Sequence, residues 1–444
     1  MPDSAAYLVS DLDAERDGDV LWDVLAEHLD EAEFLCDQRE RALESPSCTL
    51  TELEETLESR LHAHIDALVE AGPQVIRHLL EPELCAADCS ESRAAVIGLA
   101  MLALADHESL GRCLARGGCV TRGLERALFL GGTPASDEWV VQSVAGPLSK
   151  DLRISLLRVA ATRGLVIANL LAALQSDDLE ELVAATRAAL WADPTLHAPV
   201  LEYLIQHNDP EVADAALVAC MASGSRAFPE PHHVRKRMPG ANASSMMLLA
   251  LRGDAQSVEV LKGQFDDPAL REGALFALGF AGRVDLSSLL LGQLHDEDAR
   301  IRKLAAEAFA NLSGLDTSDA RYWLPDLTDD SDELPELEDD LQRDLAPSAV
   351  DELALPDSRA IASWWGQHAH ERKVSGNMLM GQPWTLKSSL SLLESFPMRR
   401  RAPLALWLLL RYGRSAHVAT RAFSTVQRAQ LLAVSKLGEH GRAR

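Results

Sequence analysis

The sequence predicts an all-α protein built as a HEAT-like α-solenoid, in which helix pairs of about 30 residues stack in a row. Three observations lead to this prediction. Hydrophobic residues make up 47% of the 444 residues and aromatic residues only 5%, and the dominance of alanine and leucine favours close helix packing over a β core. Apolar residues recur at helical spacing. An acidic helix start followed by an alanine-rich face returns at a nearly constant interval.

The repeat is clearest over residues 266–315. Pro268 follows the acidic pair Asp266 and Asp267, as at a helix start. The next acidic start, at 296–298, comes 30 residues after the first. Between them lies one apolar helix face, made by Ala274, Leu275, Ala277, Leu278 and Ala281. Because one helix pair cannot bury its apolar face without neighbours, this period is typical of a solenoid.

The same signature can be followed toward the N-terminus. Residues 208–212 match 266–270 at a distance of 58, which is two units of 29, and residues 177–180 lie 31 residues earlier still. A fainter copy begins at 150–153. We therefore expect the repeat solenoid to occupy residues 73–315.

Two longer helices are predicted before the repeats, over residues 17–44 and 49–71. Gly72 and Pro73 stop the second helix, so residues 1–72 are expected to form an N-terminal helical cap. His62 and His64 are two positions apart on this helix and lie on different faces, which makes joint metal ligation unfavourable.

An inserted loop is expected at about 223–243, where Pro229, Pro231 and Pro239 break helical continuity. The loop carries a group of basic and imidazole side chains on an otherwise acidic protein, and insertions in solenoids often lie on the binding face. A solvated connection between repeats is the alternative. The candidate binding residues here are His232, His233, Arg235, Lys236 and Arg237.

Residues 316–358 have a very different composition, with fifteen acidic residues against two arginines, a net charge of −13. Such a segment buries too little apolar surface to offset the entropy of ordering, so we expect a flexible or loosely docked acidic linker. Its apolar residues, which include Trp323 and Leu324, are available to pack on the solenoid or on a partner. The others are Leu327, Leu334, Leu337 and Leu341.

Residues 359–444 have the opposite sign, with fourteen basic residues against three acidic ones, a net charge of +11. This basic C-terminal helical segment is expected to fold back through contact with the acidic linker. Its apolar run, 402–410, is too short to span a bilayer. A core helix is the favoured interpretation. The alternative is an interfacial membrane helix that uses Arg399, Arg400 and Arg401.

The whole chain carries a net charge of −26 and has a pI near 4.9, which argues against nucleic-acid binding because phosphates would be repelled. Seven cysteines without a C-x-x-C pair, and a start without a basic and apolar leader pattern, predict a cytoplasmic protein. Cys85 and Cys89 lie one helical turn apart and are expected to be buried structural thiols rather than metal ligands.

Nothing in the sequence indicates catalysis. It contains no H-E-x-x-H, G-x-S-x-G or Walker motif. The pairs His107–Glu108 and 370–371 do not recur at the repeat spacing, as the ligands of HEAT-type metal hydroxylases do. His368, His370 and Glu371 come nearest to a metal cluster, but a surface helix is the favoured interpretation. We expect no enzyme activity, no cofactor and no metal.

A binding protein of this class uses the exposed helix of each pair and charge complementarity with its partner. Asp285, Ser288, Gln293 and His295 form one such candidate face. Further candidates are Arg283, Arg302, Trp364 and Trp365. For the arginines, including Arg271 and Arg300, a structural role is favoured, as ion-pair partners of Asp266, Asp267, Asp296 and Asp298 in adjacent repeats.

Several stretches resemble an uncharacterised bacterial family of HEAT-repeat proteins that are often encoded in type VI secretion gene clusters. The similarity rests on 273–283, on 305–309 with 312–315, and in the tail on 364–365, 381–383 and 401–410. Ser313 stands where the family pattern has threonine. The resemblance implies a cytoplasmic helical scaffold connected with secretion, and it implies no established reaction.

Together these features predict a noncatalytic protein-binding scaffold or adaptor whose partner is a secretion component or effector, with neither nucleic acid nor membrane as a partner. Two alternatives remain open. One is an enzyme on a HEAT platform, either lyase-like or metal-dependent. The other is peripheral membrane association through the basic tail.

Overall fold

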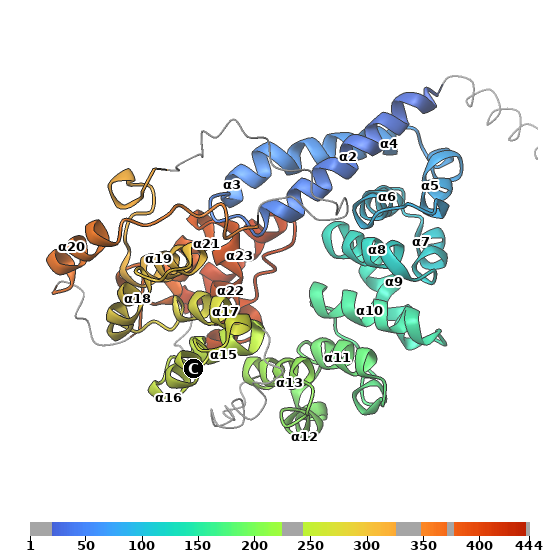
Figure 1. Ribbon diagram of the computed structural model, residues 1–444. Helices are drawn as coiled ribbons and strands as arrows, with labels where there is room; N and C mark the ends of the chain where they lie inside the picture. Colours follow the sequence, from blue (N-terminus) through green and yellow to red (C-terminus); the bar gives the residue numbers. More distant parts are fainter. Residues whose placement is uncertain (1–19, 224–242, 326–347, 371–376, 441–444) are drawn as a thin grey trace, which may run out of the picture. The chain divides into compact units, whose positions relative to one another are not determined.

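The computed structural model describes residues 20–223, 243–325, 348–370 and 377–440 (Figure 1). Helices account for almost all of the regular structure in these ranges, so the predicted all-α class is confirmed. The exception among the described residues is a two-stranded hairpin of β1 (Met378–Leu379) and β2 (Gln382–Pro383), besides two isolated bridges. The basic residues of the expected inserted loop and the centre of the acidic linker lie outside the described residues.

The chain folds into two compact units, each assembled from separate segments. The N-terminal unit comprises Met1–Ala42, Thr51–Asp193 and Arg421–Val426. The C-terminal unit comprises Leu43–Leu50, Pro194–Thr420 and Gln427–Arg444. This division differs from the four consecutive segments expected from the sequence, 1–72, 73–315, 316–358 and 359–444, because contacts between distant segments leave no mark in composition or periodicity.

The N-terminal unit begins with two long helical stretches that match the two predicted ones. The second of these contains a π-helical turn, η1 (Leu53–Glu58), which follows α3 (Leu50–Glu52) directly. A second π-helical turn, η2 (Ile76–Leu80), and a 3-10 turn, η3 (Ala173–Gln175), lie further along. The α-helices are α2 (Trp22–Ala42), α4 (Ser59–Glu70), α5 (Glu81–Cys85), α6 (Glu91–Ala103), α7 (His107–Leu114), α8 (Gly118–Gly131), α9 (Pro134–Ala145), α10 (Lys150–Arg163) and α11 (Leu179–Ala188).

The C-terminal unit contains the remaining elements. Its α-helices are α12 (Pro194–Leu204), α13 (Pro210–Ala222), α15 (Ala243–Arg252), α16 (Ala255–Lys262), α17 (Pro268–Leu278), α18 (Ser287–Gln293), α19 (Ala299–Ser313), α20 (Ser358–His368), α21 (Leu386–Ser395) and α22 (Met398–Tyr412). The 3-10 turns are η5 (Val284–Leu286), η6 (Ala320–Tyr322) and η7 (Arg414–Ala416). The last helix, α23 (Ser424–His440), begins in the N-terminal unit and continues in this one.

The acidic helix starts seen in the sequence are N-caps. Asp178, Asp209, Asp267 and Asp298 each precede a helix and accept a hydrogen bond from a backbone N–H of its first turn. Such a cap satisfies one of the orphan donors at a helix start and contributes about 1 kcal/mol. Local chemistry therefore fixes where α11, α13, α17 and α19 begin.

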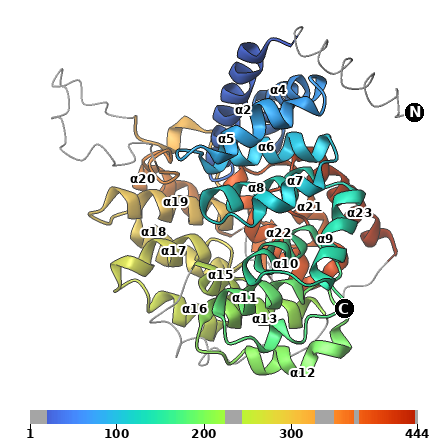
Figure 2. The same ribbon diagram turned by 90° about the vertical axis from the view of Figure 1, so that its right-hand side faces the viewer.

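Helices one sequence period apart lie side by side in both units. In the N-terminal unit α6 packs against α8, α8 against α10, and α10 against α11 (Figures 1 and 2). In the C-terminal unit the same relation links α13, α15, α17 and α19 in order. The alanine-rich faces meet here, since small side chains allow close approach of the helix axes.

The basic C-terminal segment packs on these helices. Helix α22 contacts α13 and α15. Leu404 and Leu408 of α22 belong to the same buried cluster as Leu278 and Phe309. The run 402–410 is therefore part of a core helix, as favoured from the sequence. No helix within the described ranges is long and apolar enough to cross a membrane.

The three arginines before this run do not form an exposed basic patch. Arg400 and Arg401 are buried and Arg399 is nearly so. Glu307 on α19 pairs with the Arg400 Nε atom at 3.2 Å and with an Arg399 terminal nitrogen at 3.4 Å. Arg401 donates to the main-chain oxygen of Leu393 at 2.7 Å. The expected contact with the acidic linker concerned the whole basic segment, and the centre of that linker lies outside the described residues. The membrane alternative needs these three side chains at the surface, whereas a buried carboxylate binds two of them and a buried carbonyl accepts from the third.

The described ends of the acidic linker are docked. Tyr322 and Val350 belong to the buried cluster, and Trp323 packs against it. The two ends also pair with each other, since the Asp357 N–H donates to the Tyr322 carbonyl at 2.8 Å. These parts are therefore not a free linker, and the docking option is confirmed for Trp323. Leu324 is exposed, and Leu327, Leu334, Leu337 and Leu341 lie outside the described residues.

Glu307→Ala is expected to destabilise the protein by about 3 to 5 kcal/mol, because two arginines would remain buried without their carboxylate. Chemical denaturation followed by circular dichroism measures this change. The control is Glu394→Ala on α21, where the side chain is exposed, and little change is expected. Equal effects of the two substitutions would contradict the structural role of Glu307.

Candidate functional site

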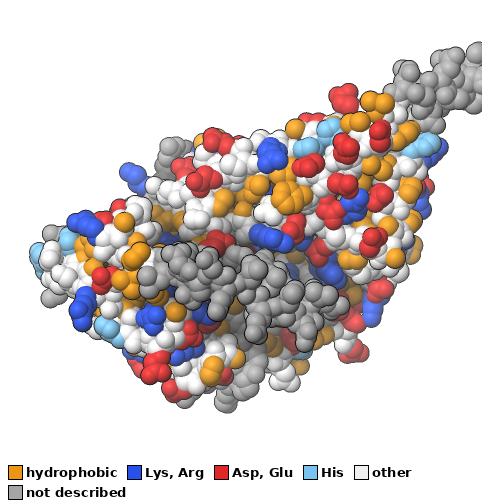
Figure 3. All heavy atoms as spheres, turned by 45° about the horizontal axis from the view of Figure 1, so that its top comes forward, with side chains coloured by type: hydrophobic (Ala, Val, Ile, Leu, Met, Phe, Trp, Pro, Cys, Tyr) orange, Lys and Arg blue, Asp and Glu red, His pale blue; other side chains and the backbone are white. Residues whose placement is uncertain are grey.

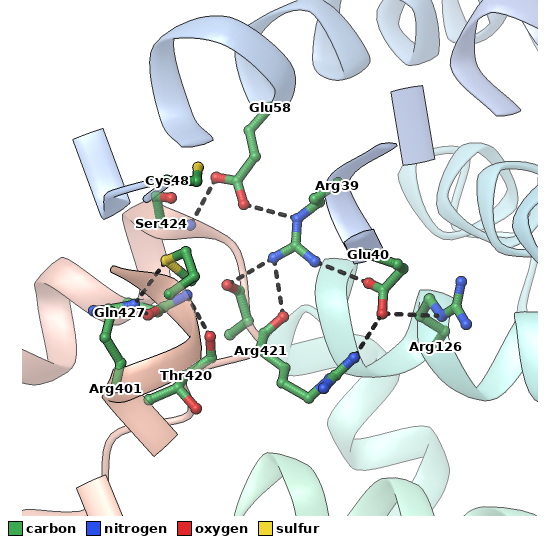
Figure 4. A network of polar contacts seen from close by, with 12 residues as sticks. Arg39, Glu40, Cys48, Glu58, Arg126, Arg401, Thr420, Arg421, Ser424 and Gln427 are labelled. Carbon is green, nitrogen blue, oxygen red and sulfur yellow. Dashed lines mark hydrogen bonds and ion pairs between the residues drawn. The ribbon is translucent and has the colours of Figure 1, made fainter. Parts of the chain in front are cut away.

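A buried polar network lies inside the N-terminal unit, where α2, the turn η1 and residues 421–426 meet (Figure 4). Its centre is Arg39, near the end of α2, which is 0% exposed. A charged side chain at such a place is costly unless it is paired and hydrogen-bonded. The surroundings of Arg39 meet both conditions.

The guanidinium of Arg39 binds acceptors on three sides. Its Nε atom donates to Glu58 Oε1 at 2.8 Å, and Nη1 donates to Glu40 Oε1 at 3.1 Å. Its Nη2 atom donates to the main-chain oxygens of Arg421 and Ala422, each at 2.9 Å. The planar fork of arginine suits this arrangement because its five N–H groups point in fixed directions.

Glu58 is placed by the π-helical turn η1, of which it is the last residue. It is 2% exposed. One carboxylate oxygen accepts from Arg39, and the other accepts from the main-chain N–H of Ser424 at 2.8 Å. A π-helical turn carries one more residue per hydrogen-bonded ring than an α-helix, and such turns occur often at functional sites. Glu58 thus connects the arginine to the segment from the far end of the chain.

Phe423 fills the apolar part of the site. Its ring is buried, with the Arg39 guanidinium 5.1 Å from its centroid and the His62 ring at 4.5 Å. His64, two positions further on, points elsewhere and lies 2.9 Å from the His28 ring nitrogen, Nδ1 to Nδ1. The prediction that His62 and His64 occupy different faces is confirmed.

The rim of the site is more exposed and carries charge. Arg421 donates to Glu40 Oε2 at 3.0 Å, and the Nε atom of Arg126 lies 4.0 Å from the same oxygen. Arg421 is 54% exposed, against 19% for Glu40. Cys36 lies close to this group, and its burial raises the pKa of the thiol.

The network contacts the segment Arg421–Ser424 through both its backbone and its side chains. It binds two successive main-chain carbonyls and one main-chain N–H, buries one aromatic ring, and pairs one cation at the rim. Main-chain contacts give affinity for any suitable backbone, and side-chain contacts add specificity.

A second feature of the N-terminal unit is an open groove of about 1180 Å³. Arg112 stands on its wall and forms ion pairs with Glu81 at 3.1 Å and Glu108 at 3.0 Å. Ala105, also on the wall, has a φ of 57°, a backbone conformation that is uncommon for any residue but glycine. Cations and carboxylates are interleaved in this groove, so it shows no clear charge preference.

The candidate face at 285–295 belongs to η5, α18 and the turn that follows. Asp285, Ser288 and His295 are exposed. Hydrogen bonds from Arg283 hold the pKa of Asp285 below its usual value, and Gln293 accepts from Arg271 at 2.8 Å. Two of the four side chains, Asp285 and Gln293, therefore already have partners within the chain.

The conspicuous arginines of the repeats are engaged with other parts of the protein. Arg271 on α17 pairs with Asp296, which lies shortly before α19. Arg300 donates to Glu272 at 2.9 Å and to Asp351 at 2.7 Å. Arg302 donates to the main-chain oxygens of 296 and 297. The favoured structural role is thus observed for Arg271, Arg300 and Arg302, although only the pair of Arg271 involves one of the expected aspartates through its side chain.

Trp364 and Trp365 pack α20 against α19. Both rings meet Phe309 edge to face, at centroid distances of 6.3 and 5.5 Å, and His368 stacks on Trp364 at 4.8 Å. Both tryptophans are half-buried, so packing already uses part of each ring. Glu371 and the loop candidates His232, His233, Arg235, Lys236 and Arg237 lie outside the described residues.

The described residues contain no group of three or more His, Cys, Asp or Glu side chains that could hold a metal ion. Cys89 is buried as expected, whereas Cys85 is exposed and accepts a hydrogen bond from Arg116 Nη1 at 2.9 Å. The expectation of a buried thiol is therefore wrong for Cys85, which lies at the end of the short helix α5.

One feature of the sequence indicates the Arg39 network, although it changes neither the composition nor any motif. Arg39 lies in register with Leu25, Leu29, Ala32 and Cys36 on the buried face of α2. A charged residue at a core position of a predicted helix needs a buried partner. The identity of that partner could not be read, because the receiving segment is 382 residues away along the chain.

Comparison with known proteins adds no relative at this point. No family model matches the chain, and neither the curated proteins nor the solved structures gave a significant match.

Arg39→Met is expected to destabilise the protein by about 3 to 5 kcal/mol, because Glu58 would remain buried without its cation. Thermal and chemical denaturation measure the change. Arg41→Met, two positions away at an exposed ion pair with Asp37, is the matched control and should have little effect. Replacing Arg39 and Glu58 together by methionine should recover part of the loss. A network without structural importance would give the same small effect for both single variants.

The thiols offer a second test. Burial raises the pKa of Cys89 and Cys113, and it raises the pKa of Cys220 to about 11. These three should react with an aromatic disulfide reagent only after unfolding, since the thiolate is the reacting form. Cys85 should react in the native protein, and Cys85→Ser should remove that fast phase. Equally fast labelling of Cys220 would contradict the described burial.

Proposed function

We propose that this chain is a noncatalytic protein-binding scaffold built as a HEAT-like α-solenoid. The observation that carries the proposal is a set of side-chain contacts between residues 28 to 31 positions apart. Lys150 and Arg153 reach Asp178 and Glu181, each 28 residues on. The Trp191 indole donates to a main-chain oxygen 30 residues back, Ser245 binds an aspartate at a separation of 31, and Arg300 binds a glutamate at 28.

These separations are close to the length of one repeat, as expected where equivalent points of successive repeats touch. This is the relation expected when each helix pair stacks on the next, and it supports the solenoid arrangement in each unit considered by itself. Stacked pairs leave one helix of each pair available to a partner. Such a surface serves binding without any catalytic group.

Exposed apolar side chains on a repeat helix support the same proposal. On α12, Leu196 is 64% exposed and Tyr203 is 77% exposed. They lie seven positions apart, so they share one helix face. The candidate face at 285–295 is exposed in a comparable position, on the second helix of its pair. Tyrosine is among the residues that contribute most at protein interfaces.

The partner class and the location rest on other grounds. The resemblance of 273–283 and of the tail to HEAT-repeat proteins of type VI secretion clusters supports an adaptor for a secretion component or effector in the cytoplasm. The net charge of −26 disfavours a nucleic-acid partner. Acidic side chains are scattered over the face shown in Figure 3, in keeping with that charge.

An affinity pull-down from the native host tests the proposal. Tagged full-length protein should retain a stoichiometric protein partner, and Ser288→Arg on α18 should weaken this retention by placing a bulky charge on the candidate face. The control, Ser391→Arg on α21, makes the same change at another exposed serine and should retain the partner.

Two results would count against the scaffold. Repeated pull-downs without any stoichiometric partner would remove its main support. Full retention by Ser288→Arg would remove the candidate face at 285–295, leaving α12 as the next surface for the same substitution strategy.

A further inference from the structure

We infer that the site around Arg39 is a peptide-recognition site for a partner protein, and that residues 421–424 occupy it within the chain. The partner segment is a turn that leads into a helix, and it carries arginine, a small residue and phenylalanine in succession, followed by a residue at the helix start that donates its main-chain N–H. This inference rests on the proposed scaffold function and assigns it a partner chemistry.

The receptor side is complete without the tail. Its contact groups are Arg39, Glu40, Glu58 and His62, which all lie on α2, η1 and α4. Residues 421–424 contribute only the bound segment. A different segment with the same chemistry would therefore meet the same set of donors, acceptors and ring contacts.

The site can exchange its occupant without leaving a bare buried charge. Arg39 remains paired with Glu58 at 2.8 Å and with Glu40 at 3.1 Å when the segment departs. The departure breaks the hydrogen bonds to two carbonyls and one N–H of the segment, and water can take their place. A buried pair that stays intact avoids the large penalty of an unpaired ion.

The side-chain pockets define what the partner needs. Ala422 is 2% exposed, so only a small residue fits at that position. Phe423 contacts both a guanidinium and an imidazole ring, which favours an aromatic ring at the next position. The carboxylate of Glu40 at the rim favours a cation two residues before that ring.

The segment within the chain competes with any partner. A tethered ligand acts at an effective concentration in the millimolar range, so the site of the wild-type protein is normally filled. A substitution that weakens the binding of residues 421–424 to the site should therefore allow a free peptide to bind there. The free peptide should not need a higher affinity than the segment itself.

The experiment uses the full-length protein with Phe423→Ala and a fluorescent peptide with the sequence of residues 418–427. Fluorescence anisotropy should show saturable binding to the variant and at least about tenfold weaker binding to wild type. A control peptide with alanine in place of phenylalanine should bind the variant at least about tenfold more weakly. Circular dichroism establishes that the variant is folded.

A second variant covers the case in which Phe423→Ala fails to fold. Arg421→Ala removes the rim contact of a half-exposed side chain, so the fold should persist while the tethered segment is weakened. The Arg421→Ala variant should also bind the peptide of residues 418–427 more tightly than the wild-type protein does. If the folded variants bind the two peptides equally or not at all, the inference is overturned.

Light scattering measures the oligomeric state and so tests whether a second copy of this chain supplies the segment. A dimer that dissociates when the free peptide is added would mean that a second copy of this chain supplies the segment, which overturns the assignment to a partner protein. Failure of the inference is distinguishable from failure of the scaffold proposal, because the pull-down with Ser288→Arg concerns the C-terminal unit and its result does not depend on peptide binding.

Discussion

The N-terminal unit depends on the charge buried at Arg39. A fully enclosed guanidinium has to find several acceptors, and here it finds Glu58, Glu40 and two main-chain carbonyls. The two carbonyls come from the far end of the chain. These two hydrogen bonds, with the one from the Ser424 N–H to Glu58, attach residues 421–426 to a unit that otherwise ends at Asp193.

The C-terminal unit receives a segment in return. Residues 43–50 belong to it, and the Met398 N–H donates to the Cys48 carbonyl at 2.8 Å, next to a bridge between Thr49 and Pro397. Each unit is therefore completed by a short segment from a distant part of the sequence. Contacts between such distant residues have to offset the entropy of closing a long loop.

Local features of the fold could be predicted, and distant ones could not. The acidic starts at Asp178, Asp209, Asp267 and Asp298 became N-caps, since capping involves only neighbouring residues. The burial of the arginines at 399–401 could not be predicted, because composition gives charge but not burial. For the site, the core register of Arg39 was readable, whereas its partner at 421–422 was not, because nothing local connects positions 382 residues apart.

Native-state hydrogen exchange tests most directly whether residues 421–426 are part of the N-terminal unit. The central amide is that of Ser424, which donates to the buried Glu58. If the network holds the segment in place, the amides of 422–426 should exchange slowly and lose protection together with those of η1 and α4 as denaturant is added. Rapid exchange at Ser424 in a protein whose α2 and α4 remain protected would contradict the account.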